Sequence, residues 1–297
     1  MDNVLTLIAA PHAADLDDGL VADIRAALKG LGADVGMPDW LSPGRACDIA
    51  FGHLAPEQAD SAARHRLGDL AVDVVAQASS GRRKMLLVAD MDSTMVTGET
   101  LDELAEFAGI KDKIAAITAR AMNGEIGFEA ALKERIGLLD GLPASALDEA
   151  WERVEYTGGA RKLVQTMKKH GAYAVLVSGG FKYFTARVRE HCGFDVDLAN
   201  EFIFVNGRLK GVQEPILGRE AKLATLMGTA GERQIPLSLA AAVGDGANDL
   251  DMLRAAGLGV AFHAKPIVSA EARVRIDHGD LTAMLYAQGY RDGEMVG

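Results

Sequence analysis

Cysteine is scarce in this chain of 297 residues, which contains only Cys47 and Cys192. Neither lies in a Cys-x-x-Cys pair, and one possible bridge cannot form the disulfide framework of a small secreted protein. The seven histidines show no His-Glu-x-x-His or comparable spacing, so the sequence does not indicate a zinc site. We therefore expect a protein of a reducing compartment.

Long apolar runs are missing too, and the charge is unbalanced. Apolar runs such as residues 85–89 and 237–243 are far shorter than the roughly 18 residues of a membrane-spanning helix. No basic segment precedes the first apolar run, so no secretory signal is predicted. The chain has 31 basic and 42 acidic residues and a formal net charge of −11, which would repel polyanions. We expect a cytoplasmic location, with neither nucleic acid nor membrane as a partner.

The length predicts about two domains. Residues 1–80 show short apolar runs and helical spacing in the order β-α-β-β-α-β, which predicts a small α+β domain. The hydrophilic stretch 79–84 then predicts a linker. Residues 81–297 form the second predicted domain.

Unbroken apolar runs at residues 85–89, 174–177 and 239–243 predict strands that are buried on both faces of a parallel sheet. Helical stretches separate these runs, so we expect an α/β fold with a doubly wound, Rossmann-like parallel sheet. The segment at about 98–156 is too long for one crossover helix and predicts an inserted helical cap. Asn206-Gly207 between apolar residues predicts a β-hairpin over 202–212.

Polar residues follow each of the three predicted buried strands. Asp90 and Asp92 follow the first, Ser178 and Gly179 the second, and the run Asp245 to Asp249 the third. Ligands bind at the carboxyl ends of strands in open α/β sheets, so these loops should converge. Clustered carboxylates are tolerable around a hard cation, and oxygen ligands select Mg²⁺. The pattern indicates phosphoryl chemistry with an aspartate as nucleophile.

Three other readings of these motifs fail. An EF-hand loop starting at Asp90 would need Gly at its sixth position and Glu at its twelfth, but the sequence has Met95 and Leu101 there. A dinucleotide fingerprint starting at Gly244 lacks its third glycine. A nucleophile elbow at Ser178 would need Gly two residues earlier, but the sequence has Leu176 there. Each motif alone could be an ordinary turn, but their joint occurrence after buried strands is harder to dismiss.

The chain resembles the phosphatases of the haloacid dehalogenase superfamily and, more narrowly, the phosphoserine phosphatase family. The resemblance covers roughly residues 85 to 290. It rests on Asp90-Met91-Asp92-Ser93-Thr94, the strand that ends at Ser178, the isolated Lys222 and the run Gly244 to Asp249, in that order.

The resemblance implies a role for each matching residue. Asp90 would be the nucleophile and a Mg²⁺ ligand, and Asp92 the general acid and base, which binds Mg²⁺ through its backbone carbonyl. Asp245 would be the third protein ligand of the metal. The phosphate would be contacted by Ser178, the Gly179 amide and Lys222. Asn248 would help to hold the phosphate or the attacking water. Asp249 would orient Lys222 or the waters of the metal.

The cap would supply specificity in this family. Glu99 would pair with the ammonium of phosphoserine, and Arg135 would take its carboxylate. Met122 and Phe128 would lie near the substrate and exclude water. Without the resemblance, Glu99 and Arg135 would be read as ordinary exposed helix charges.

Residues 1–80 resemble ACT-like regulatory domains, mainly in their order of elements. They could bind an amino acid, or they could serve as a dimerisation or purely structural module through which a homodimer forms. The sequence leaves these readings open.

Taken together, the sequence predicts a Mg²⁺-dependent phosphomonoesterase. The resemblance implies that it hydrolyses O-phospho-L-serine, the last step of serine biosynthesis, through an aspartyl-phosphate. Two alternatives stay open. One is a phosphotransferase or phosphatase of the same fold that acts on another small phosphate ester, and the other is a binding protein with an idle α/β domain.

Overall fold

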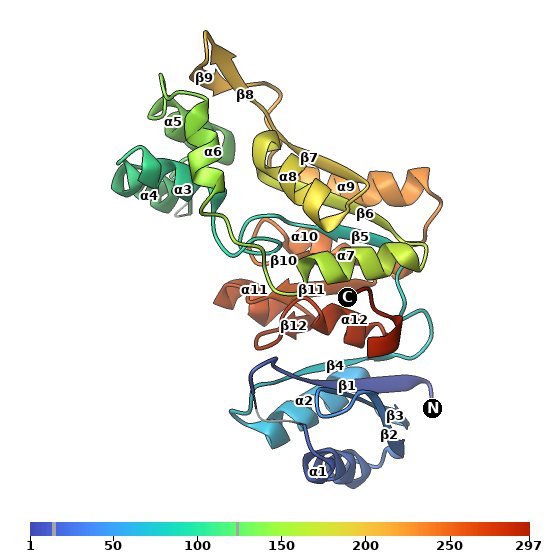
Figure 1. The fold of residues 1–297 in the computed structure, drawn as a ribbon. Helices are drawn as coiled ribbons and strands as arrows, with labels where there is room; N and C mark the ends of the chain where they lie inside the picture. Colours follow the sequence, from blue (N-terminus) through green and yellow to red (C-terminus); the bar gives the residue numbers. More distant parts are fainter. Residues whose placement is uncertain (14–15, 123–124) are drawn as a thin grey trace.

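In the computed structural model, which describes residues 1–13, 16–122 and 125–297, six parallel strands form one sheet (Figure 1). Their order across the sheet is β12 (Val274–Ile276), β11 (Leu258–Phe262), β10 (Ala240–Gly244), β5 (Leu86–Ala89), β6 (Tyr173–Phe181) and β7 (Val196–Asn200). The four residues of β5 are all buried, because β10 and β6 flank this strand and helices cover both faces of the sheet. The predicted doubly wound α/β fold is confirmed.

Two helical layers cover the sheet. One face packs on α7 (Ala160–Lys169), α8 (Lys182–Cys192) and α12 (Ala283–Ala287), and the other on α9 (Glu220–Glu232), α10 (Leu250–Ala255) and α11 (Pro266–Glu271). Successive residues of β5 serve opposite cores, because side chains alternate across a strand. Two short 3-10 helices, Leu237–Leu239 and Asp292–Glu294, complete the connections.

The insertion between β5 and α7 consists of helices that lie to one side of the sheet (Figure 1). They are α3 (Thr100–Phe107), α4 (Lys111–Met122), α5 (Phe128–Gly137) and α6 (Ser145–Trp151). A bridge between Val96 and Tyr156 joins the two ends of this insertion. The chain therefore leaves the sheet and returns to it at nearly one point.

A β-hairpin, formed by β8 (Phe202–Val205) and β9 (Arg208–Val212), packs against the same insertion. The hairpin was predicted from Asn206-Gly207, and both residues have positive φ angles, as this kind of turn requires. The amide of Gly141 donates to the carbonyl of Leu209 at 2.8 Å. This contact between the hairpin and the insertion was not predicted.

Residues 1–80 form a four-stranded antiparallel sheet with two helices. The elements are β1 (Asn3–Ala9), α1 (Asp18–Gly30), β2 (Asp34–Ser42), β3 (Ala46–Gly52), α2 (Pro56–Leu67) and β4 (Val72–Ala78), in the predicted order. The sheet order is β2-β3-β1-β4. We call this part the N-terminal module.

Buried polar contacts fix the N-terminal module to the rest of the chain. The Asp73 carboxylate on β4 is fully buried and accepts from the amides of Asp277, His278 and Gly279 at 2.8, 3.2 and 2.7 Å. Arg82, in the predicted linker, pairs with Asp48 of β3. Within the segment 79–84, the side chains of Arg82, Arg83 and Lys84 are all anchored by hydrogen bonds.

Three strands of the large sheet, β7, β11 and β12, were not predicted. They have five, five and three residues, and runs this short carry little periodic signal. Both cysteines are free and buried. Among the described residues, no helix combines the length and the apolar character needed to cross a membrane.

The Asp73 contacts predict a stability effect. Asp73→Ala should lower the free energy of unfolding by about 3 kcal/mol, because it leaves buried amides without an acceptor. Asp69→Ala changes an exposed aspartate of the same module and should stay within about 0.5 kcal/mol of wild type. Urea denaturation measures both values, and equal losses would contradict the role of Asp73.

Candidate active site

The polar residues predicted to converge lie together at the carboxyl ends of neighbouring strands. Asp90 directly follows β5, and Asp245 directly follows β10. Ser178 and Gly179 lie within β6, which extends to Phe181 through an irregular register. The strand there is thus longer than predicted, but its polar residues occupy the expected edge of the sheet.

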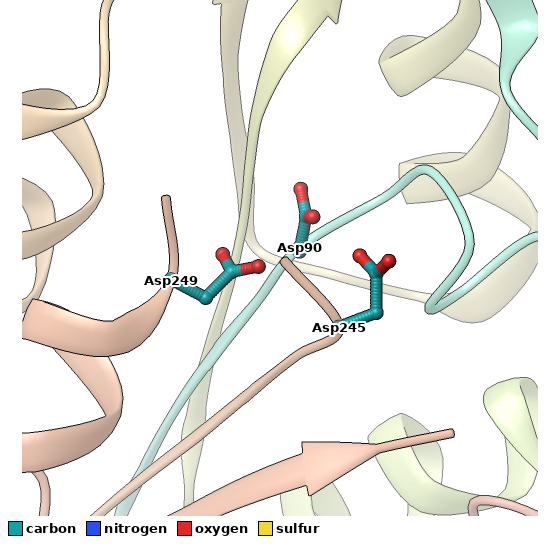
Figure 2. A group of neighbouring side chains, drawn as sticks. All are labelled: Asp90, Asp245 and Asp249. Atoms are coloured by element: carbon teal, nitrogen blue, oxygen red, sulfur yellow. The ribbon is translucent and has the colours of Figure 1, made fainter. Parts of the chain in front are cut away.

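Three carboxylates crowd together at this edge. Asp90, Asp245 and Asp249 each offer an oxygen within 4.8 Å of the others, and all three side chains are buried (Figure 2). Complete burial raises the pKa of Asp90 well above its usual value, and the neighbouring Asp249 raises it further. The pKa of Asp245 is also raised, mainly by burial. Burial and the neighbouring carboxylate therefore both disfavour the ionised forms of Asp90 and Asp245.

Lys222 supplies a buried positive charge to the cluster. Its Nζ lies 2.8 Å from Asp90 Oδ1 and 2.6 Å from Asp249 Oδ1. Burial alone would lower the pKa of this ammonium, but the two aspartates outweigh burial and raise it. Lys222 therefore stays charged beside Asp90.

The donor set fits a hard divalent cation. Carboxylate oxygens are the ligands that Mg²⁺ prefers. Three buried carboxylates surround the buried ammonium of Lys222, which leaves an excess of negative charge in the cluster. Asp249 has less capacity for a metal, because its oxygens accept from Lys222 at 2.6 Å and from the Gly246 amide at 3.0 Å. This arrangement supports the predicted orienting role of Asp249.

Asp92 is positioned by two donors. Its Oδ1 accepts from the Thr100 amide at 2.8 Å, and its Oδ2 accepts from the Ser178 hydroxyl at 3.1 Å. The Ser178 oxygen in turn accepts from the Gly180 amide at 2.8 Å. Burial raises the pKa of Asp92, which favours the protonated form that a general acid needs.

Glycine at position 180 is required by close packing. A Cβ there would lie 3.0 Å from both Asp92 Oδ2 and Ser178 Oγ. A side chain would therefore displace the two groups whose positions the site depends on.

A cavity of about 560 Å³ opens above these residues and is closed on the other side by the insertion. Eight of the predicted site residues line it: Asp90, Asp92, Glu99, Arg135, Ser178, Gly179, Asp245 and Asn248. Lys222 and Asp249 lie behind this wall rather than on it. The structure thus brings the residues of the insertion and those of the sheet to one cavity.

Glu99 and Arg135 give this cavity an acidic and a basic group. Burial raises the pKa of Glu99 to about 7, and Asp92 and Asp245 add to the shift. The Glu99 carboxylate accepts from the Ser93 hydroxyl at 3.1 Å. Arg135 has no ion pair with any described residue, and burial lowers its pKa against the opposing effect of Asp102 and Glu99. Its guanidinium is therefore available to an anionic group.

Phe128 begins α5 and lies over Gly179, where a Cβ would come within 3.1 Å of its ring. It lines the cavity, as predicted. The side chain of Met122 is outside the described part of the structure.

Lys265 was missed by sequence reasoning. It lines the cavity, and its Nζ lies 3.5 Å from Asp245 Oδ2. Its amide also donates to the Asp245 carbonyl at 3.2 Å. The residue follows β11 by three positions, so it could have been found only by recognising β11 as another strand of the parallel sheet.

The comparisons with known proteins agree on one family. The family model of haloacid dehalogenase-like hydrolases matches residues 87–254. A phosphoserine phosphatase of Streptococcus thermophilus is 43% identical over 199 residues, covering 67% of this chain and 93% of the relative. A phosphoserine phosphatase of Streptomyces coelicolor is 41% identical over 250 residues, covering 83% of this chain. The chain spans 61% of that relative's length.

Solved structures resemble nearly the whole chain, including the N-terminal module. A haloacid dehalogenase family hydrolase from Salmonella enterica serovar Typhi superposes with a TM-score of 0.84 at 26% identity, covering 96% of this chain and 98% of that structure. A probable phosphoserine phosphatase from Vibrio cholerae superposes with a TM-score of 0.79 at 28% identity. The match covers 97% of this chain and 86% of that structure.

The Lys265 contact predicts an effect on cation binding. Lys265→Met should tighten Mg²⁺ binding about two- to fivefold, because it removes an exposed positive charge that competes for Asp245. Asp245→Asn should weaken binding about tenfold or more. Calorimetric titration without substrate measures both, with Asp102→Asn in the same cavity as a control. An unchanged affinity in Lys265→Met would contradict the competition.

Proposed function

This chain belongs to the phosphoserine phosphatase family of haloacid dehalogenase-like hydrolases, and from that premise we propose that it hydrolyses O-phospho-L-serine to L-serine and phosphate. The reaction would be the last step of serine biosynthesis. The observation that carries the proposal is the single cavity in which Asp90 and Asp92 face Glu99 and Arg135.

We propose that Asp90 is the nucleophile. Its carboxylate would attack phosphorus as the bond from phosphorus to the serine oxygen breaks, leaving an aspartyl-phosphate. Asp92 would give its proton to the departing serine oxygen. The raised pKa of Asp92 supports this role, since the acid must hold its proton until the leaving group needs it.

The second half of the reaction would use the same two aspartates. Asp92, now ionised, would take a proton from water as the water oxygen attacks phosphorus. The bond from phosphorus to Asp90 then breaks, which releases phosphate and restores the carboxylate. The protons balance over the two steps, because the proton that Asp92 takes from water replaces the one that it gave to serine.

The transferring phosphate would be held by groups that surround Asp90 in the cavity. Lys222 contributes its charge from behind the nucleophile at 2.8 Å, and Ser178, the Gly179 amide and Asn248 line the cavity beside it. Mg²⁺ would be held by Asp90, Asp245 and the backbone carbonyl of Asp92, and when bound it would supply positive charge to the phosphoryl oxygens. It would also favour the ionised form of Asp90.

Specificity would come from the insertion. The substrate carries an ammonium and a carboxylate beside its phosphate. Glu99 would pair with the ammonium and Arg135 would bind the carboxylate through two parallel hydrogen bonds. Phe128 would exclude water over the phosphate end, where its ring leaves no room for a Cβ at position 179.

We propose domain limits at 1–80 and 81–297, with the cap at about 98–156. A homodimer through the N-terminal module remains part of this proposal. Asp73 and Asp48 already hold one face of its sheet against the rest of the chain. A second copy would have to contact the helices or the edge strand β2.

Asp90→Asn should abolish turnover, because an amide cannot form the aspartyl-phosphate. Phosphate release from O-phospho-L-serine measures the loss, and circular dichroism checks that the fold is intact. Asp195→Asn, which changes a carboxylate away from the cavity, is the control. Turnover near the wild-type rate would exclude Asp90 as the nucleophile.

Arg135→Ala should lower kcat/KM for O-phospho-L-serine about 100-fold, as expected for a lost charge-assisted contact of about 3 kcal/mol. An aryl phosphate without a carboxylate should lose much less. Steady-state kinetics on both substrates gives the comparison. An equal loss on both would remove the specificity role of Arg135.

Glu99 predicts a pH dependence. The group must be ionised to attract the ammonium, and its pKa is raised to about 7, so binding should improve as the pH rises through this value. Mg²⁺ near Asp245 would move the transition to lower pH. The ratio of kcat/KM for phosphoserine to that for an aryl phosphate should rise with pH in wild type and stay flat in Glu99→Gln. The same rise in the variant would contradict this role.

A further inference from the structure

A second cavity, of about 670 Å³, lies at the opposite end of the large sheet from the acidic cluster. One wall comes from the residues that precede β5, β10, β11 and β12, including Lys84 and Arg273. The other wall comes from α2 and β4 of the N-terminal module, including Glu57, Asp60 and Gln77. The cavity is therefore bounded by both parts of the chain.

Lys84 is a buried cation without a buried counterion. Its residue is 5% exposed, and its Nζ donates to the carbonyls of Gly81 and Ser238, each at 2.8 Å. An ammonium has three N–H donors, so one remains. No carboxylate forms an ion pair with Lys84 among the described residues, although buried charges are normally paired.

Arg273 adds a second unpaired cation on the same wall. Its only hydrogen bond within the described part of the chain is a long one of 3.4 Å, from Nη2 to the Ala256 carbonyl. Burial lowers the pKa of Lys84, and the charge of Arg273 lowers it further. An anion between the two would offset the repulsion between their charges. Two adjacent unpaired cations are unexpected in a chain whose net charge is −11.

The opposite wall limits how much negative charge the cavity accepts. Asp60 is held by Arg64, whose Nε donates to it at 2.8 Å, and Glu57 is exposed at the start of α2. These acids would repel a dianion such as phosphate. Lys84 has one unused N–H, and Arg273 has several, which is enough for the two oxygens of one carboxylate.

We propose that this cavity binds a small organic carboxylate through Lys84 and Arg273. The carboxylate belongs either to a simple organic acid or to an amino acid, whose ammonium would face Glu57. A ligand whose ammonium also faces Glu57 touches both walls and binds only when the N-terminal module is seated on the large sheet. Binding therefore stabilises that arrangement by mass action. The inference does not depend on the proposed reaction.

The test uses two probes that differ in one group, L-lactate and L-alanine, titrated calorimetrically into the full chain. We expect at least one of them to bind with a Kd of about 10 mM or tighter and to raise Tm. Arg273→Gln should weaken this binding at least tenfold, whereas Arg135→Ala, in the other cavity, should leave it unchanged. Stronger binding of L-alanine that falls to the L-lactate value in Glu57→Gln identifies the amino acid as the ligand class, and equal binding identifies the organic acid.

Three results would overturn the inference. They are no binding of either probe up to about 50 mM, binding that survives Arg273→Gln, and binding that is lost in Arg135→Ala. Lys84→Met provides a second variant of the same wall. Lys84 also binds two carbonyls, so its removal can destabilise the fold. The Arg273 variant therefore decides the test, because Arg273 is exposed and weakly bonded.

Discussion

The acidic centre of this protein depends on the buried ammonium of Lys222. Asp90 and Asp249 both lie within ion-pair distance of it, so this one cation holds both carboxylates in place. Removing either partner from such a buried arrangement leaves an uncompensated charge, which is far more costly than a lost surface pair. The remaining excess of negative charge makes a divalent cation the natural completion of the site.

The insertion supplies the part of the cavity wall that the sheet does not form. Glu99 and Arg135 belong to it, and their side chains reach the cavity only because the insertion sits over the ends of β5 and β6. Contacts at its far side hold it there: Tyr183 of α8 donates to Asp148 of α6, and Lys133 of α5 pairs with Glu214. The residues that we propose for the chemistry and those that we propose for substrate recognition thus belong to different elements.

The N-terminal module is joined to the large sheet by specific polar contacts rather than by a loose linker. Asp73 and the Arg82–Asp48 pair lie in the interface itself, where a partner lost from either side would leave a buried polar group unsatisfied. These contacts explain how both parts of the chain can line one cavity. They also make the module part of one structure with the large sheet rather than a loosely attached domain.

The sequence by itself determined the parallel sheet, the buried strands β5, β6 and β10, the order of elements in the N-terminal module and the β8–β9 hairpin, because apolar runs and turn residues are local signals. It also predicted that Asp90, Ser178 and Asp245 would converge, since parallel strands end at one edge. Only the tertiary structure decided that Lys265 lies beside Asp245 and that Lys84 and Arg273 share a cavity. Lys84 and Arg273 are far apart in the sequence, and Lys265 follows a strand too short to recognise. The distances within both pairs depend on packing, which no local pattern encodes.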